Sequence, residues 1–280
     1  YSNYVEPHLY KNERVFVIIS DAFRYECAKE LCDIINLERR GTATVEAMQG
    51  VLPSYTKLGM ASLLPNKNIV IDDKNVYIDG INTSSTENRD KILKSKCHDS
   101  IAIIYNSLKD LSSSEFRNTF TGKKVIYIYH NVIDARGDNS LSEREVFEAV
   151  EDTFNELKQL IGKLINRSNA SNIYITSDHG FLYRRGGLSE SDKLKYDGEA
   201  NSKRYVLTDE IKEQTGTMTF SMDYILEKDN KKYVTVPKGV IRFSKQGAGS
   251  NYVHGGAMLQ EIVIPVIKYK NSRGDGKNTN

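Results

Sequence analysis

An aspartate and a histidine stand side by side where a short apolar run ends. The run, residues 173–176, is rich in β-branched and aromatic side chains and is therefore typical of a buried strand. Asp178 and His179 follow it, and ligands in open α/β sheets bind at the carboxyl ends of the strands. A carboxylate oxygen and an imidazole nitrogen suit a divalent metal such as zinc. The same pair is also consistent with a helix-capping aspartate and a buried histidine.

Acidic or imidazole side chains recur at comparable places along the chain. Asp21 ends the apolar run 15–19, Asp134 and Asp138 share a tight loop after the run 125–129, and His254 lies in the Gly-rich stretch 246–256. Each has a simpler explanation, since the aspartates can serve a turn and a helix cap and a lone histidine can be hydrogen-bonded in a core. Together they predict enough ligands for two divalent metals.

The hydroxyl of Thr56 is a candidate nucleophile for a reaction at these predicted metal ligands. Thr56 begins a short helix predicted over residues 56–64, where backbone N–H groups and the helix dipole favour a phosphate. A metal-bound threonine is an activated nucleophile. Two metals about 3.5 to 4 Å apart can clamp the attacking and leaving oxygens of a phosphoryl displacement. The alternative for Thr56 is an ordinary helix N-cap.

Basic residues and one further histidine accompany these ligands. We expect His130 to support a ligand rather than to bind metal itself. Arg24 either clamps a phosphate oxygen or forms an ion pair on the helix surface. The pairs 184–185 and 203–204 either steer an anionic substrate or form a solvated basic surface.

The elements that must position these side chains alternate between strands and helices. Strands are predicted at residues 15–19, 42–48, 125–129, 173–176 and 262–268, and long helices at 25–40 and 141–167. Shorter strands are predicted at 69–71, 76–78, 218–220, 233–236 and 240–243, the last three antiparallel, with one or two helices within 90–111. This order predicts an α/β fold, a doubly wound and mostly parallel sheet flanked by helices.

The same pass along the chain predicts a single domain over residues 1–270. Segments 66–122 and 184–250 read as insertions that form a lid, and 271–280 as a flexible tail. The chain does not begin with Met, and we expect it to be a piece of a longer protein.

Composition narrows the class of protein. The chain has 280 residues, 39% hydrophobic and 27% charged, which is typical of a globular protein. Its net charge of +2 argues against wrapping duplex DNA, because such binding depends on clustered Lys and Arg. The three cysteines form neither a disulfide framework nor a zinc motif. No apolar run is long enough to cross a bilayer, so we expect no membrane partner and a cytoplasmic location.

Five motifs, in order, resemble the PglZ domain, a branch of the alkaline phosphatase superfamily. They are residues 15–26 (VFVIISDAFRYE), 52–65 (LPSYTKLGMASLLP), 129–138 (YHNVIDARGD), 175–181 (ITSDHGF) and 252–256 (YVHGG). The resemblance spans nearly the whole chain.

The resemblance implies two metal sites with zinc as the first choice. Asp21, Asp178 and His179 match one site, Thr56 matches the nucleophile between the metals, and Asp134, Asp138 and His254 match the other. The superfamily often has a histidine where Asp138 stands, so the second site is richer in oxygen and can admit manganese or magnesium.

The resemblance also implies a biological setting. PglZ proteins belong to BREX phage-defence systems, and the domain also occurs in response regulators. The implied activity is a metal-dependent phosphatase or phosphodiesterase acting on nucleotides or short oligonucleotides, with other defence proteins as partners. A non-catalytic scaffold that binds metal or nucleotide is the alternative. A sulfatase would need Cys or Ser in place of Thr56, and a mutase would need a transfer domain that the chain lacks.

Overall fold

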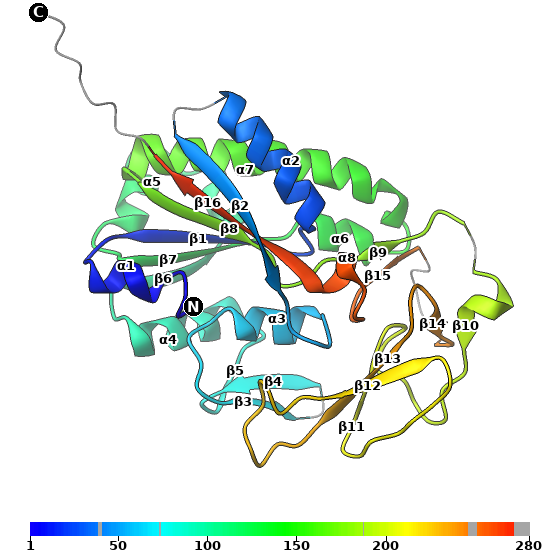
Figure 1. Cartoon of the computed structure of the whole chain (residues 1–280). Coiled ribbons are helices and arrows are strands. Elements are labelled where there is room, and N and C mark those ends of the chain that lie inside the picture. The colour runs from blue at the N-terminus through cyan, green and yellow to red at the C-terminus, as the bar shows by residue number, and fades with distance from the viewer. Residues whose placement is uncertain (39–40, 73, 187, 246–250, 272–280) are drawn as a thin grey trace, which may run out of the picture.

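A six-stranded mixed sheet forms the centre of the molecule (Figure 1). The computed structural model describes residues 1–38, 41–72, 74–186, 188–245 and 251–271. In spatial order the strands are β2 (Thr42–Gln49), β16 (Val263–Lys270), β8 (Asn172–Thr176), β1 (Val15–Ser20), β7 (Val125–His130) and β6 (Ser100–Ile104). β8, β1, β7 and β6 are parallel neighbours, whereas β16 runs antiparallel to both β2 and β8. The predicted α/β class and mostly parallel sheet are confirmed.

Helices cover both faces of this sheet. They are α1 (Glu6–Tyr10), α2 (Tyr25–Glu38), α3 (Thr56–Ser62), α4 (Thr86–Lys96), α5 (Ser113–Phe120), α6 (Ile133–Gly137), α7 (Val146–Ser168) and α8 (Leu259–Ile262), with short 3-10 turns η1 (Tyr105–Leu108), η2 (Glu143–Glu145) and η3 (Glu190–Asp192). The β1 side chains alternate between two cores, because successive residues of a strand point to opposite faces. Phe16 and Ile18 pack with α2, α5 and α7, and Val17 and Ile19 pack with α3 and α4.

The longest helix, α7, is amphipathic and ends where the sequence changes character. Its buried side chains recur at helical spacing, including Phe154, Leu157 and Ile161. Asn169 terminates it in the left-handed conformation (φ 51°). The helix begins at Val146 rather than at the predicted residue 141, since a turn and η2 occupy the preceding residues. Across the part of the chain that is described, no helix is both long and apolar enough to pass through a bilayer.

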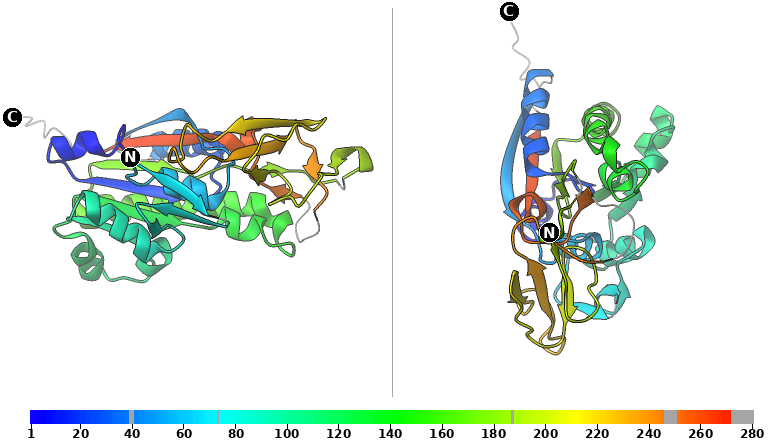
Figure 2. Two further views of the ribbon diagram at one scale, coloured as in Figure 1. Left: turned by 90° about the horizontal axis from the view of Figure 1, so that it is seen from below. Right: turned by 90° about the vertical axis from the view of Figure 1, so that its right-hand side faces the viewer.

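Small sheets lie outside the central one. They are β3–β4–β5 (Ile69–Asp72, Asn75–Ile78, Ile81–Asn82), β11–β13–β12 (Val206–Thr208, Tyr233–Pro237, Thr217–Ser221), β10–β14 (Lys193–Leu194, Arg242–Phe243) and β9–β15 (Leu182–Tyr183, Tyr252–Val253). The β10–β14 region and α1 lie at opposite ends of the molecule (Figure 2, left).

Two predictions about these peripheral segments were wrong. Segment 66–122 is not wholly an insertion, because its strand β6 forms an edge of the central sheet beside β7. The pattern was missed because the apolar residues of β6 lie within a stretch read as helical. The strand expected at 240–243 is β14, which pairs in parallel with β10 rather than antiparallel. Residues 246–250 of the Gly-rich loop and 272–280 of the expected tail lie outside the described residues.

Candidate metal centre

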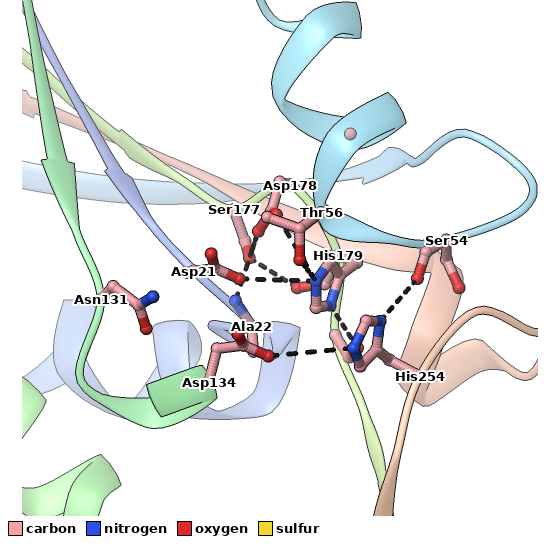
Figure 3. A network of polar contacts seen from close by, with 12 residues as sticks. Asp21, Ala22, Ser54, Thr56, Asn131, Asp134, Ser177, Asp178, His179 and His254 are labelled. Carbon is pink, nitrogen blue, oxygen red and sulfur yellow. Dashed lines mark hydrogen bonds and ion pairs between the residues drawn. The ribbon is translucent and has the colours of Figure 1, made fainter. Parts of the chain in front are cut away.

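Two acidic side chains and a histidine meet at the carboxyl ends of β1 and β8. These strands are parallel and in register, with Ile19 opposite Thr176, so the residues that follow them emerge at the same edge. Asp21, Asp178 and His179 are 3%, 1% and 0% exposed. The structure therefore places these three predicted ligands together, away from solvent (Figure 3).

The hydrogen bond of His179 fixes which ring nitrogen faces the acids. Nδ1 lies 2.9 Å from the carbonyl oxygen of Gly180, which only accepts, so Nδ1 carries the hydrogen. Nε2 then presents a lone pair. It lies 3.4 Å from Asp21 Oδ1 and 3.5 Å from Asp178 Oδ2. The ring is thus oriented as a metal ligand, by the carbonyl contact that commonly orients such histidines.

The acidic oxygens around this lone pair have no partner. Asp21 Oδ1 and Asp178 Oδ2 are buried without a hydrogen bond. Burial raises the pKa of Asp21 well above its ordinary value, and the charges of Asp178 and Asp134 add to the effect. Ligand atoms of Asp21, Asp178 and His179 all lie within 4.8 Å of one another. Unpartnered carboxylate oxygens facing an imidazole lone pair are a donor set that a divalent cation satisfies, so the residues fit the predicted metal.

Thr56 reaches this group from the start of α3. The N-cap of α3 is Tyr55, and no side chain caps the helix. The Thr56 hydroxyl instead donates to His179 Nε2, with Oγ1 3.0 Å away. Gly59 makes the approach possible, because a Cβ at this position would overlap the backbone carbonyl of Asp178. The N-cap alternative for Thr56 is therefore excluded.

Backbone groups of the β1–α2 turn hold Asp178 and its neighbour in place. The Ala22 amide donates to Asp178 Oδ1 (3.3 Å), and the Phe23 amide donates to Ser177 Oγ (2.9 Å). Ala22 has a φ of +61°, which L-residues seldom adopt. The sequence reading gave no role to Ser177 or Ala22, although both adjoin predicted ligands.

A second group lies beside the first and shares His179 with it. Asp134, His179 and His254 place ligand atoms within 4.8 Å of one another. The His254 ring stacks on that of His179, with centroids 4.1 Å apart and planes 4° apart. His254 Nε2 is 3.9 Å from Asp134 Oδ1, and its Nδ1 faces the Ser54 carbonyl oxygen at 3.3 Å. Burial, followed by the proximity of His179, lowers the pKa of His254.

Tyr252, which the sequence reading passed over, also belongs to this second group. Its hydroxyl donates to Asp134 Oδ1 at 3.0 Å. Tyr252 lies on β15, two residues before His254, and this proximity in the sequence was the available signal. The side chains of Asp134 and His254 are 15% and 18% exposed, so this group is more open than the first.

Asp138 lies outside both groups of ligand atoms found among the described residues. It is exposed and caps the C-terminus of α6, and its amide donates to the Asp134 carbonyl oxygen (2.8 Å). Its charge acts to raise the pKa of His254, which places it within electrostatic range. Metal binding by Asp138 stays a prediction.

Arg24 and His130, the two residues expected to support the site, make different contacts in the structure. The Arg24 guanidinium pairs with Glu26 and lies 5.0 Å above the Phe181 ring, the ion-pair alternative of the sequence reading. His130 contacts Ser20 Oγ (2.9 Å) and Glu156 Oε2 (3.1 Å) through its ring. Its backbone carbonyl accepts from the Asp21 amide at 2.9 Å. His130 therefore supports Asp21 through the backbone.

Arg204 is structural rather than a surface cation. It is fully buried, and its Nε and Nη2 donate to the two oxygens of Glu261 at 2.9 and 2.8 Å. Glu261 also accepts from the Gly256 amide (2.9 Å), and Ser54 Oγ donates to the Gly256 carbonyl (2.7 Å). Both alternatives given for Arg204, substrate steering and a solvated basic surface, were wrong, since its pair with Glu261 instead anchors the loop that carries His254.

The fold and the two Asp/His groups define an alkaline phosphatase-like domain. Residues 1–269 match the family described as the BREX system PglZ alkaline phosphatase-like domain. The chain belongs to this PglZ family, which confirms the resemblance seen in the sequence.

Relatives and solved structures agree with this assignment. The chain is 54% identical over 277 residues to the alkaline phosphatase-like protein PglZ of Bacillus cereus, covering 98% of this chain and 32% of that protein. It is 42% identical over 267 residues to the alkaline phosphatase-like protein BrxZ of Escherichia coli, covering 92% and 30%. The chain thus spans about a third of the length of these relatives.

Solved structures share the fold at low identity. Murine ectonucleotide pyrophosphatase/phosphodiesterase 5 superposes with a TM-score of 0.59 at 12% identity, covering 92% of this chain and 88% of that one. Phosphonoacetate hydrolase from Sinorhizobium meliloti does so with a TM-score of 0.53 at 10% identity, covering 91% and 89%. These likenesses establish the alkaline phosphatase-like fold.

Proposed function

We propose that this domain is a metal-dependent phosphodiesterase that acts on nucleotides or short oligonucleotides, with Thr56 as its nucleophile. The observation that carries the proposal is the position of Thr56 Oγ1, 3.0 Å from His179 Nε2 in the group formed with Asp21 and Asp178. A hydroxyl directed at a buried set of metal-ligand atoms matches the requirement for an activated nucleophile.

Each residue has a defined part in the proposed reaction. Asp21, Asp178 and His179 hold one divalent ion, and Asp134 and His254, with Asp138, hold another; zinc is our first choice, with manganese or magnesium possible at the second. When bound, such ions supply Lewis-acid stabilisation of phosphoryl oxygens and lower the pKa of a nearby hydroxyl.

Thr56 Oγ1 attacks the phosphorus as the bond from phosphorus to the leaving oxygen breaks. The Thr56 hydroxyl proton passes to solvent and the departing alcohol takes one from solvent; water then hydrolyses the phosphothreonine ester and restores the Thr56 hydroxyl. The hydrogen bond from His179 Nδ1 to Gly180 keeps the ring in the orientation that this arrangement needs.

The substrate class is supported by a structural neighbour. One structure of the murine phosphodiesterase 5 is described as an inactive threonine-to-alanine variant in complex with AMP. That protein's dependence on a threonine and its binding of a nucleotide agree with the roles proposed here. We further propose that the domain acts in BREX phage defence in the cytoplasm, together with other proteins of that system.

Thr56→Ala tests the nucleophile. With bis-p-nitrophenyl phosphate as substrate, we expect turnover to fall by at least about 1,000-fold while metal content is retained, because the nucleophile is lost but the Asp and His ligands remain. Thr56→Ser, which keeps a hydroxyl, is the matched control and should retain measurable turnover.

Unchanged hydrolysis by Thr56→Ala would reject the nucleophile assignment. A metal-loaded wild-type protein that is inert on every ester would favour the scaffold alternative instead.

A further inference from the structure

A cavity of about 510 Å³ is lined by the two residues that flank the proposed nucleophile in the sequence. Tyr55 and Lys57, which flank Thr56 in the sequence, both line it. Lys74, Tyr205 and Lys245 contribute from other parts of the chain. Its volume falls within the roughly 300–1,000 Å³ usual for small-molecule sites. The cavity thus adjoins Thr56 along the chain, without Thr56 itself being part of its lining.

Two tyrosines form an aromatic wall of this cavity. The Tyr55 and Tyr205 rings lie with their centroids 5.1 Å apart and their planes inclined by 32°. Gly255, with a φ of +116°, lies against the Tyr205 ring so closely that a Cβ would overlap it. Arg204, the residue before Tyr205, is fixed in the core by Glu261. Tyr205 is thus held beside Tyr55 by neighbours that cannot easily shift, and such a wall suits a nucleobase or sugar face.

The charged residues of the lining are predominantly cationic. Lys57 Nζ donates to the Lys74 carbonyl at 2.6 Å, which uses one of the three N–H groups of its ammonium. Lys245 Nζ donates to the carbonyls of Ala200 and Asn201. Among the described lining residues the only acid is Glu199, whose side chain is 96% exposed and 4.0 Å from Lys245. Three lysines against one solvated carboxylate favour an anionic ligand.

We propose that this cavity is a subsite for a second phosphate of the substrate, with the nucleoside between the two phosphates resting against the tyrosine wall. The proposal rests on the proposed function, because the reacting phosphate is taken to lie at Thr56. It assigns Lys57, Lys74 and Lys245 as the residues that favour a nucleotide carrying a further phosphate over a simple phosphodiester.

The test compares two chromogenic esters that differ by one phosphate. They are the p-nitrophenyl ester of thymidine 5′-monophosphate and the same ester phosphorylated at the 3′ oxygen. Because exposed ion pairs each contribute modestly, we expect a KM about tenfold lower for the 3′-phosphorylated ester in the wild type. The preference should shrink as salt is added, since screening weakens exposed charge pairs.

The variant Lys57→Gln/Lys74→Gln should lose most of this preference. Glutamine keeps a polar, hydrogen-bonding side chain at both positions while the charge is removed. The control Lys67→Gln/Lys231→Gln removes the same charge from exposed lysines outside the cavity and should keep the preference. Absence of any preference in the wild type, or an equal loss in the control, would overturn the subsite.

Measurements of nucleotide binding test the subsite independently of the proposed hydrolytic function. If neither ester is hydrolysed, the function fails, and calorimetry with thymidine 3′,5′-bisphosphate and thymidine 5′-monophosphate still tests the subsite on the zinc-loaded protein. Tighter binding of the bisphosphate that depends on Lys57 and Lys74 supports the subsite. Equal affinities for the two nucleotides, or binding of neither, reject it.

Discussion

The two candidate metal groups share His179 but differ in how their acidic members are held. Asp21 and Asp178 follow strand ends, are almost fully buried and keep oxygen atoms without partners. Asp134 lies on the short helix α6, is partly exposed and already accepts a hydrogen bond from Tyr252. A buried, unpartnered carboxylate is costly unless a cation or a proton neutralises it, whereas a partly exposed and hydrogen-bonded one costs less. The difference indicates that the first group depends on a cation for its stability more than the second does.

The largest expected effect separates the metal affinities of the two groups. Asp178→Asn should weaken binding of one metal equivalent by at least about 100-fold, since losing a ligand should exceed the 10- to 100-fold cost of losing a ligand's hydrogen-bond partner. Asp134→Asn should weaken the other equivalent by a smaller factor. Competition titration with a chelating dye measures both. Equal losses in the two variants would remove the distinction between the groups.

The next prediction concerns the stability of the metal-free protein. Here the loss of an acidic side chain should be favourable, whereas it weakens metal binding. Above the raised pKa of Asp21, Asp21→Asn should stabilise the metal-free protein by about 1–2 kcal/mol, because the amide is uncharged and can donate to the unpartnered Asp178 Oδ2. The same substitution should abolish binding of one metal equivalent. Thermal unfolding in a chelator measures the stability, with Asp134→Asn as the control that should change it little. A destabilised Asp21→Asn protein would show that the carboxylates are satisfied in a way the geometry does not display.

A smaller effect on metal affinity is expected from Tyr252, whose hydroxyl supports Asp134 in the second group. Tyr252→Phe removes only the hydroxyl that donates to Asp134 Oδ1. Affinity for the second metal equivalent should fall about tenfold, at the lower end for such supporting partners, and the first equivalent should be unaffected. The same dye titration checks both. Loss of the first equivalent would mean that the two groups are not separable.

The smallest expected effect is on the pH dependence of stability, through Glu156, which contacts the His130 ring and belongs to neither candidate metal group. Hydrogen bonding to His130 and Lys109 lowers the pKa of Glu156 from 4.5 to about 2. The folded state thus gains stability from this carboxylate above pH 4.5 and loses it as the pH falls towards 2. Because the Glu156 side chain is partly exposed (25%) and solvent screens the interaction, we expect about 1 kcal/mol. Urea unfolding of wild type and Glu156→Gln at pH 7 and pH 3 measures it.

The wild type should be the more stable of the two at pH 7, and the difference should be smaller at pH 3. Metal content should be the same in both proteins. A change in metal content would show that His130 acts on the metal ligands through its side chain.

The positions of the strand-end side chains were predictable because β1 and β8 are short, mostly apolar runs that end abruptly. Asp21, Asp178 and His179 follow those runs, and a parallel sheet brings such ends to one edge. Thr56 was identified by its place at the start of a helix, but its orientation depends on Gly59 packing against Asp178, a contact between distant segments.

Other features depended on tertiary contacts that no local pattern encodes. Arg204 belongs to a basic dipeptide in the sequence, and only its pairing with Glu261, 57 residues away, shows that it is buried. The strand β6 combines small and apolar residues that also suit a helix, and its place beside β7 decides the outcome. The cavity lined by Tyr55 and Lys57 is assembled from segments that the sequence reading treated as unrelated.

Anomalous diffraction from crystals of the zinc-loaded protein tests the central claim most directly. We predict one ion bound by Asp21, Asp178 and His179 within coordination distance of Thr56 Oγ1, and a second beside Asp134 and His254. The absence of an ion beside Asp21 and Asp178 in fully loaded crystals, or an ion there that does not reach Thr56, would contradict the account.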